Sequence, residues 1–241
     1  MNLLDPNEKI LAIDIGGSRI KATILDTYGE ILHDYVRVQT PASAGPEDVL
    51  QAIEELTKEF RVYSKVSVGF PGYVKNGVVY TAPNLSTEKW KGFDFKKGLS
   101  KLLKQPVRVV NDADMQGLGI AAGKGLEMVV TLGTGFGTAL LMDGILLPHL
   151  EVAHHPLSKE RDYDQYIGKK ALDEVGIERW NKRVKFVIEV LITVFNYDHL
   201  YISGGNAKRI NFKIDENIFL VSNMDGIKGG ANLWHKDHFN V

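Results

Sequence analysis

The stretch ILAIDIGGSRIKATIL, residues 10–25, contains two short apolar runs that meet at a pair of glycines. The first run, Ile10 to Ile15, is rich in β-branched residues, and the second, Ile20 to Leu25, alternates apolar with other side chains. Both patterns favour β-strands, and glycine permits a tight turn between them. The stretch therefore predicts a β-hairpin with its turn at Gly16-Gly17.

More elements follow this hairpin in a regular order. A third strand is expected from about Ile31 to Val38, and Pro46 opens a helix with apolar residues every three or four positions. The other elements expected in this half are a strand at 65–70, a hairpin arm at 77–80, a helix at 95–104 and a strand at 107–110.

The second half of the chain repeats the beginning of the first. An apolar run at 128–132 leads into Gly133-Thr134-Gly135-Phe136-Gly137, and a second strand leaves at 138–142. The pattern indicates a helix at 114–122, before these strands, and a second helix at 178–196, after them. A strand at 200–202 before Gly204-Gly205 and a glycine turn at Gly229-Gly230 follow. We expect a duplicated α/β fold with lobes at 1–110 and 111–241 around a cleft, allowing for a last helix that packs back on the first lobe.

Composition narrows the possible functions. The 241 residues are 44% hydrophobic and carry a formal net charge of -1, so no global basic field favours a nucleic acid or an anionic membrane. The absence of cysteine excludes disulfides, thiol catalysis and thiolate metal sites. Because no apolar run approaches the roughly 20 residues of a membrane helix and no signal peptide is evident, we expect a cytoplasmic protein.

Glycine turns at strand ends can hold a phosphate, because converging backbone N–H groups form an anion nest. Neither a Walker A sequence nor a dinucleotide fingerprint is present, and a single glycine hairpin more commonly binds nothing. Two similar hairpins in two halves, with hydroxyls at Ser18, Thr134 and Thr138, could instead enclose a phosphate from both sides.

Two acidic positions lie at the ends of apolar strands. Asp14 would be costly to bury unless it is paired or holds a cation such as Mg²⁺, although it could also simply form the turn. Asp112 follows Asn111 at the carboxyl end of a strand, where α/β sheets place ligands, and could act as a general base. Helix capping would equally explain Asp112 or Asp114, and spacing alone does not choose between them.

His149, Glu151, His154 and His155 form the densest group of potential ligands. They could bind zinc, although nothing in the spacing fixes a geometry. Glu151 and His154 also suit the hydroxyls of a sugar, and a solvated polar loop is the simplest alternative.

Seven motifs occur together in one order over residues 10–234. They are Asp14-Ile15-Gly16-Gly17-Ser18, Phe70-Pro71-Gly72, Pro83-Asn84-Leu85, Asn111-Asp112-Ala113-Asp114, Leu132-Gly133-Thr134-Gly135-Phe136-Gly137, Glu151-Val152-Ala153-His154 and Gly204-Gly205. In this order the chain resembles the ROK family of sugar kinases, and most closely its polyphosphate glucokinase-like branch. The resemblance implies an actin-like ATPase, ribonuclease H-like duplicated fold with two lobes around a cleft.

The resemblance also implies roles for single residues. Asp112 matches the general base, and Asp14 matches a residue beside Mg²⁺, in contact directly or through water. The positions matching sugar contacts are Asn84, Asn111, Glu151 and His154, with Glu160 as a looser match. The positions matching phosphate or donor contacts are Asp14, Gly16, Gly17, Ser18, Lys21, Gly133, Thr134, Gly135, Gly204 and Gly205.

The chain departs from the family pattern at two points. Ala153 stands where the family has glycine, and the cysteine zinc motif of many members is missing, as in the polyphosphate-using branch. No zinc is therefore expected.

The expected activity is phosphorylation of a hexose, with the 6-hydroxyl of glucose as first choice and mannose as an alternative. Polyphosphate, ATP or both could be the donor, and the chain is expected to form a homodimer without nucleic acid or membrane partners. A track of positive charge for polyphosphate could come from Lys89, Lys91, Lys96, Lys97, Lys101, Lys104 and Arg108, although such lysines more often only solvate a helix.

Two other classes of function share these features. A non-catalytic sugar-responsive binding protein would need a DNA-binding segment, and only nine residues precede Ile10 in this sequence. An actin-like nucleotide-binding assembly protein could use the same glycine hairpins, but it would leave Asn84, Asn111, Glu151 and His154 without a task.

Overall fold

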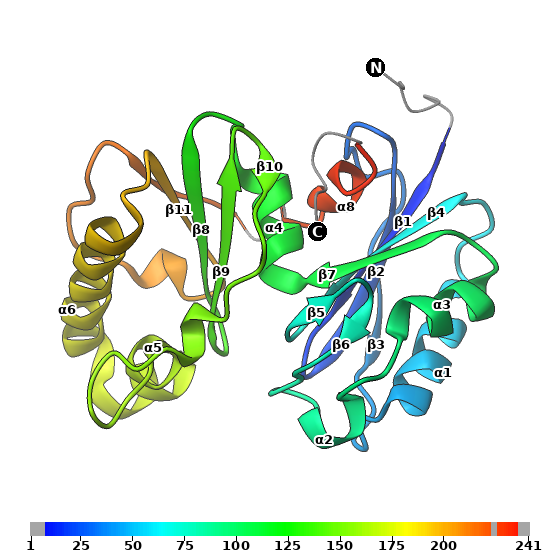
Figure 1. Ribbon diagram of the computed structural model, residues 1–241, viewed down its shortest axis with the longest axis horizontal. Helices are drawn as coiled ribbons and strands as arrows, with labels where there is room; N and C mark the ends of the chain where they lie inside the picture. Colours follow the sequence, from blue (N-terminus) through cyan, green and yellow to red (C-terminus); the bar gives the residue numbers. More distant parts are fainter. Residues whose placement is uncertain (1–7, 223–225, 236–241) are drawn as a thin grey trace.

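Two five-stranded sheets, both within the described residues, form the frame of the protein. The structure is a computed structural model that describes residues 8–222 and 226–235. One sheet lies in each lobe, and helix α4 lies between them (Figure 1).

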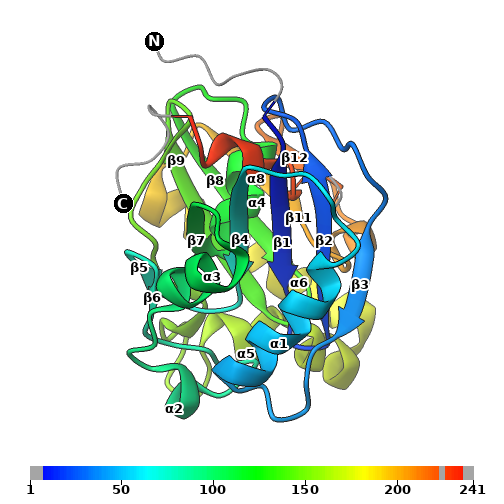
Figure 2. The same ribbon diagram turned by 90° about the vertical axis from the view of Figure 1, so that its right-hand side faces the viewer.

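The first lobe contains the elements that the opening hairpin begins, and their order largely follows the sequence pattern. They are β1 (Ile10–Ile15), β2 (Arg19–Leu25), β3 (Val36–Gln39), α1 (Pro46–Thr57), β4 (Lys65–Phe70), β5 (Val74–Lys75), β6 (Val78–Val79), α2 (Thr87–Trp90), α3 (Phe95–Leu103) and β7 (Val107–Asn111). Helices α1 and α3 lie side by side over one face of the sheet (Figure 2).

The remaining elements begin with α4 and belong mainly to the second lobe. They are α4 (Asp112–Ile120), β8 (Leu126–Leu132), β9 (Phe136–Met142), β10 (Ile145–Leu146), η1 (Val152–His154), α5 (Tyr163–Ile167), α6 (Lys169–Phe195), β11 (His199–Ser203), η2 (Ala207–Arg209), β12 (Ile218–Leu220) and α8 (Gly229–Asn232).

The two sheets have the same topology, which confirms the predicted duplication. Their strand orders are β3-β2-β1-β4-β7 and β10-β9-β8-β11-β12. In each sheet the first three strands in chain order pair antiparallel and the next two pair parallel. The two glycine turns therefore occupy equivalent ends of equivalent hairpins.

Each lobe has its own apolar core. Trp90 lies fully buried in the first core, beside Phe70 and Phe95, and Trp180 of α6 lies fully buried in the second. Large aromatic side chains bury much apolar surface, which is the main driving force for folding. Each lobe is thus stabilised largely by its own core.

Between the lobes, α4 and α8 form a third core with strands of both sheets. Helix α4 packs closely on α8 and on β9 because one residue at each contact is a glycine and lacks a Cβ atom. A Cβ on Gly229 would lie 1.8 Å from the carbonyl oxygen of Met115, and one on Gly117 would lie 2.7 Å from the Cβ of Ala139. Helix α8 thereby packs against both α4 and β1.

Some predicted elements were wrong in extent or type. The strand expected from Ile31 is only β3, because Ile31 makes just an isolated bridge to Leu25. Gly229 and Gly230 begin α8 and do not form a turn; these glycines serve close packing instead. Helix α6 starts nine residues before the predicted helix, and Gly176 interrupts it with a φ of 75°.

No helix in the described ranges combines the length and the apolar character needed to span a bilayer.

Candidate active site

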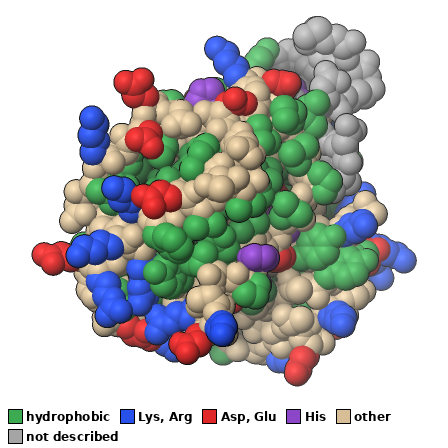
Figure 3. All heavy atoms as spheres, turned by 60° about the vertical axis from the view of Figure 1, so that its left-hand side comes forward, with side chains coloured by type: hydrophobic (Ala, Val, Ile, Leu, Met, Phe, Trp, Pro, Cys, Tyr) green, Lys and Arg blue, Asp and Glu red, His purple; other side chains and the backbone are tan. Residues whose placement is uncertain are grey.

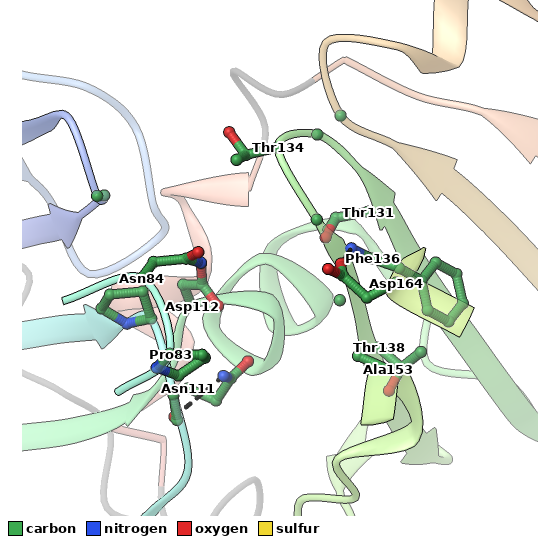
Figure 4. Close-up of a pocket in the computed structure, with 18 of the residues that line it drawn as sticks. Pro83, Asn84, Asn111, Asp112, Thr131, Thr134, Phe136, Thr138, Ala153 and Asp164 are labelled. Atoms are coloured by element: carbon green, nitrogen blue, oxygen red, sulfur yellow. Dashed lines mark hydrogen bonds between the residues drawn. The ribbon is translucent and has the colours of Figure 1, made fainter. Parts of the chain in front are cut away.

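The two lobes enclose a cleft of about 540 Å³. Figure 4 shows Asn84 and Asp112 on one side of this space and Thr131, Thr134 and Asp164 on the other. The sequence-predicted residues that line it are Asp14, Gly16, Gly17, Lys21, Asn84, Asn111, Asp112, Gly133, Thr134, Gly135, Glu151, His154, Gly204 and Gly205. Ser18 and Glu160 are exposed and lie outside the lining.

The first glycine hairpin is closed by backbone hydrogen bonds at the end of β1. The Gly16 N–H donates to the Arg19 carbonyl at 2.9 Å, and the Gly16 carbonyl accepts from the Thr40 hydroxyl at 2.6 Å. A Cβ on Gly17 would lie 3.2 Å from the backbone oxygen of Asn84. Glycine therefore lets the hairpin come close to the Asn84 segment.

Asp14 lies opposite Lys21 in the register of this hairpin, and its Oδ2 is 3.6 Å from the Lys21 Nζ. Burial raises the pKa of Asp14, and the charge of Lys21 opposes that rise. The partly buried Asp14 carboxylate, in the cleft lining beside the first glycine hairpin, fits Mg²⁺, which usually binds one or two carboxylates together with substrate phosphates. The described residues contain no group of three or more His, Asp or Glu side chains that could hold a metal by themselves.

The second glycine hairpin joins β8 to β9. The Gly133 N–H donates to the Gly135 carbonyl at 3.0 Å, and the Phe136 N–H donates to the Asp164 carboxylate at 2.7 Å. A Cβ on Gly135 would lie 2.5 Å from the same carboxylate. The Thr138 hydroxyl is buried and donates to the Leu150 carbonyl at 3.2 Å, so in this structure it serves the loop.

The third glycine loop is tied to the second. Gly204 has a φ of 99°, and a Cβ there would lie 2.3 Å from the Leu132 carbonyl oxygen. The Asn206 side chain donates to the Gly133 carbonyl at 3.0 Å, and its backbone N–H donates to the Leu132 carbonyl at 2.9 Å. These contacts hold both loops of the second lobe as one unit.

Asp112 is the first residue of α4. Its Oδ1 accepts a hydrogen bond from the Ala113 N–H at 2.9 Å. Burial raises the pKa of Asp112 to about 7, the charge of Asp14 adds to the rise, and the Ala113 N–H opposes it. A carboxylate with a pKa near neutrality is well matched to a general base.

Asn111 and Asn84 are amides on the same side of the cleft. Asn111 is buried and caps α4, since its Oδ1 accepts from the Ala113 N–H at 2.8 Å. Its Nδ2 donates to the Gly72 carbonyl at 3.1 Å. Asn84 is exposed in the turn that faces Gly17.

Asp114, His149 and Glu151 form a connected row of charges. The Asp114 Oδ2 lies 2.9 Å from the His149 Nδ1, and the His149 Nε2 lies 3.7 Å from the Glu151 Oε1. Burial alone would lower the pKa of His149, but its contacts with Asp114 and Glu151 raise it to about 10. Burial raises the pKa of Asp114. Burial would also raise the pKa of Glu151, but His149 and other partners bring it below its ordinary value.

His154 and Glu160 lie in more open positions. The His154 side chain is 49% exposed, and its Nδ1 lies 3.4 Å from the Asp162 carboxylate. Glu160 belongs to an exposed turn in which its N–H donates to the Ser158 hydroxyl at 3.3 Å. Of the two, only His154 lies in the lining of the cleft.

Sequence reasoning missed four polar residues in the cleft lining: Gln116, Thr131, Asp164 and Lys170. Asp164 lies in α5 and reaches back over 28 positions to the second hairpin, so no local spacing points to it. Lys170 lies in the first turn of α6, and the sequence pattern predicts that this helix begins only at residue 178.

The suggested track of positive charge does not reach this cleft. Of the described lysines and arginines, Lys21 and Lys170 line it, and none of the seven track residues does. Lys89 donates instead to the Ser43 carbonyl at 2.8 Å, and Arg108 lies over the Trp234 ring at 4.6 Å.

Comparisons with known proteins give consistent matches. Residues 10–151 match the family model described as the ROK family. A polyphosphate glucokinase of Mycobacterium tuberculosis (strain ATCC 25618 / H37Rv) is 34% identical over 222 residues, which are 88% of this chain and 81% of the relative.

Solved structures give the same picture. The inorganic polyphosphate/ATP-glucomannokinase from Arthrobacter sp. strain KM is 31% identical with a TM-score of 0.85, covering 95% of this chain and 100% of that one. A ROK family glucokinase from Streptomyces griseus, in complex with glucose and AMPPNP, has a TM-score of 0.79 at 19% identity, covering 93% and 98%. This last likeness concerns the fold alone.

Proposed function

Because the chain belongs to the ROK family, we propose that it transfers a phosphoryl group from polyphosphate or ATP to a hexose, with the 6-hydroxyl of glucose as acceptor. It is a hexokinase-type sugar kinase. The relatives that match most of its length are named for glucose and polyphosphate, or for polyphosphate, ATP and both glucose and mannose. Mannose is therefore the second acceptor to test.

One observation carries the proposal. The Asp112 carboxylate lines a cleft whose walls also contain glycine hairpins from two different sheets, and burial raises the pKa of this carboxylate to about 7. Phosphoryl transfer needs a base at the attacking hydroxyl and backbone donors around the transferring phosphate. This cleft offers both.

Each part of the cleft has a proposed task. Asp112 accepts the proton of the sugar hydroxyl, and Asn84, Asn111, Glu151 and His154 hold the other hydroxyls. The hairpins at Gly16 and Gly133 surround the phosphoryl group, and Gly204-Gly205 contacts the distal part of the donor. Lys21 and Lys170 supply positive charge beside the phosphates. Water must be excluded, because it would compete as the nucleophile.

Asp14, with Asp112 nearby, is the proposed site for Mg²⁺. When bound, Mg²⁺ neutralises charge on the phosphates. Replacing Asp14 with asparagine should raise the Mg²⁺ concentration for half-maximal activity by about 10- to 100-fold, as expected for a residue that orients a bound ion. Asp48→Asn, which removes an exposed carboxylate on α1, is the control. An unchanged Mg²⁺ requirement in Asp14→Asn would place the ion elsewhere.

The function is tested with purified protein, glucose or mannose, Mg²⁺, and either polyphosphate or ATP. The expected result is a hexose 6-phosphate, and competition between the donors shows which one is preferred. If no sugar is phosphorylated with either donor, the proposed function is wrong. Glucose-independent polymerisation with ATP would then favour an assembly protein, and sequence-specific DNA binding would favour a regulator.

We also infer that two copies associate through the exposed apolar face of α6. Phe186 is 46% exposed and Val194 is 61% exposed, two helical turns apart. Hydrophobic side chains gather over the middle of the molecular face that Figure 3 brings forward. Contiguous exposed apolar surface often marks an interface.

The double variant Phe186→Asp, Val194→Asp should behave as a single chain in light scattering, while the native protein has twice that mass. Tyr28→Asp, which changes a side chain that is 79% exposed on the first lobe, should keep the native mass. A native protein with the mass of one chain would contradict the dimer.

The expected location in the cytoplasm stays a prediction.

A further inference from the structure

Glu151 is held by side chains of both lobes. The Thr81 hydroxyl, from the first lobe, donates to the Glu151 Oε1 at 3.3 Å. The His149 Nε2, from the second lobe, lies 3.7 Å from the same oxygen. Within residues 8–222 and 226–235, no hydrogen bond or ion pair uses the Glu151 Oε2. Because Glu151 lines the cleft, this second oxygen is available to a ligand.

His149 is itself tightly placed. Its side chain is only 6% exposed, its ring stacks on Tyr73 at 5.9 Å, and its Nδ1 lies 2.9 Å from the Asp114 Oδ2. Asp114 is buried in α4, two residues after Asp112. A single imidazole thus joins the helix that carries the proposed base to the loop that carries Glu151.

Charge explains why a histidine suits this place. The carboxylates of Asp14, Asp112, Asp114 and Glu151 lie in or beside one cleft, and like charges there oppose ionisation. A protonated histidine has two N–H donors on opposite sides of its ring, so it can serve two carboxylates at once. Leucine or phenylalanine at this position would leave Asp114 as a buried charge without compensation.

We propose that His149 is a positioning residue for the sugar: it bridges Asp114 and Glu151 and fixes the Glu151 carboxylate so that its second oxygen accepts hydrogen bonds from hexose hydroxyls. The proposal rests on the proposed function, because it assumes that Glu151 contacts the sugar. His149 acts through Glu151 and does not touch the transferring phosphate. Its loss should therefore weaken hexose binding and leave donor binding unchanged.

The test compares steady-state kinetics of His149→Phe with the native enzyme. Phenylalanine keeps a ring against Tyr73 and removes both nitrogens. The KM for glucose should rise about 10- to 100-fold, as expected when a charged hydrogen-bonding partner is lost, while the KM for the donor stays within about twofold. The double variant Asp114→Asn, His149→Phe also removes the buried charge of Asp114. It replaces the single variant in these measurements if the single variant does not fold.

The decisive comparison uses Glu151→Gln as background. If His149 acts through Glu151, adding His149→Phe to Glu151→Gln should raise the glucose KM by less than about twofold. His199→Phe changes another histidine of the second lobe, packed on Phe219 and away from the cleft, and should leave the glucose KM unchanged. A purely structural role would lower stability without this dependence on Glu151.

Two results would overturn the inference. One is an unchanged glucose KM in His149→Phe, and the other is an equal rise in the native and Glu151→Gln backgrounds. A native enzyme that phosphorylates no sugar would instead contradict the proposed function. If Glu151→Gln alone weakens glucose binding and His149→Phe does not, the function stands and only the positioning role is lost.

Discussion

Replacing Asp112 with asparagine is expected to lower the turnover number by about 10²- to 10⁴-fold, the usual contribution of a well-placed general base. Asparagine has nearly the same shape and keeps the oxygen that accepts the 2.9 Å hydrogen bond from the Ala113 N–H. It cannot accept the proton of a sugar hydroxyl. The measurement is the initial rate of hexose phosphate formation at saturating glucose and donor.

The fold should survive this change, because it removes a partly buried negative charge that Asp14 and Asp114 repel. Glucose should still raise the melting temperature of the variant, which separates lost chemistry from lost binding. Turnover close to that of the native enzyme, in a folded variant, would show that Asp112 is not the base.

The pH dependence gives a second measure of the same group. Burial, followed by the charge of Asp14, raises the pKa of Asp112 to about 7; Asp114 adds to the rise, and the Ala113 N–H and His149 oppose it. Only the ionised carboxylate is a base, so kcat/KM should increase with pH through about 7 and level off above it. More Mg²⁺ beside Asp14 should move the midpoint to lower pH, because a cation favours the charged form.

Replacing Gly204 with alanine is expected to lower the free energy of unfolding and to damage donor binding. The backbone φ of 99° is unfavourable for any residue with a Cβ, at about 1–3 kcal/mol. The new Cβ would also lie 2.3 Å from the Leu132 carbonyl oxygen, and relieving such overpacking costs about 1–3 kcal/mol more. Since Leu132 precedes the hairpin at Gly133, the strain should displace the phosphate loop and lower kcat/KM for the donor by about 10²-fold.

Gly205→Ala is the matched control for stability, because a Cβ at Gly205 would meet no atom within 4 Å. Denaturant unfolding of both variants measures the difference. Equal unfolding free energies for the two variants would mean that the Gly204 backbone is not constrained as described.

Much of the frame could be predicted because it depends on local patterns. The runs at 10–15 and 128–132 end at glycines, and this alone predicts two equivalent hairpins, both of which form. The equivalence of the two sheets could be expected only in outline. Nothing in residues 218–220 reveals the edge strand β12, which is short and largely exposed.

Other features could not be predicted because they depend on contacts between distant residues. A glycine pair favours a turn in isolation, yet Gly229 is needed because Met115 lies against it across more than one hundred positions. Asp164 reaches the second hairpin from a separate helix. The sequence indicates His149 as a possible ligand, but its pairing with Asp114 requires the fold to bring α4 and the loop after β10 together.

Helix α4 lies in the layer between the two lobes, and Asp112 is its first residue. When two rigid bodies rotate against each other, a point near the axis travels little and a point at the rim travels far. If the lobes rotate about this layer, the rims that carry Gly16 and Gly133 would sweep toward each other while the carboxylate stayed almost still. An isotopic label in the Asp112 side chain should therefore show little displacement between the open and closed forms of the protein. Probes on the rims that carry Gly16 and Gly133 should show a large displacement.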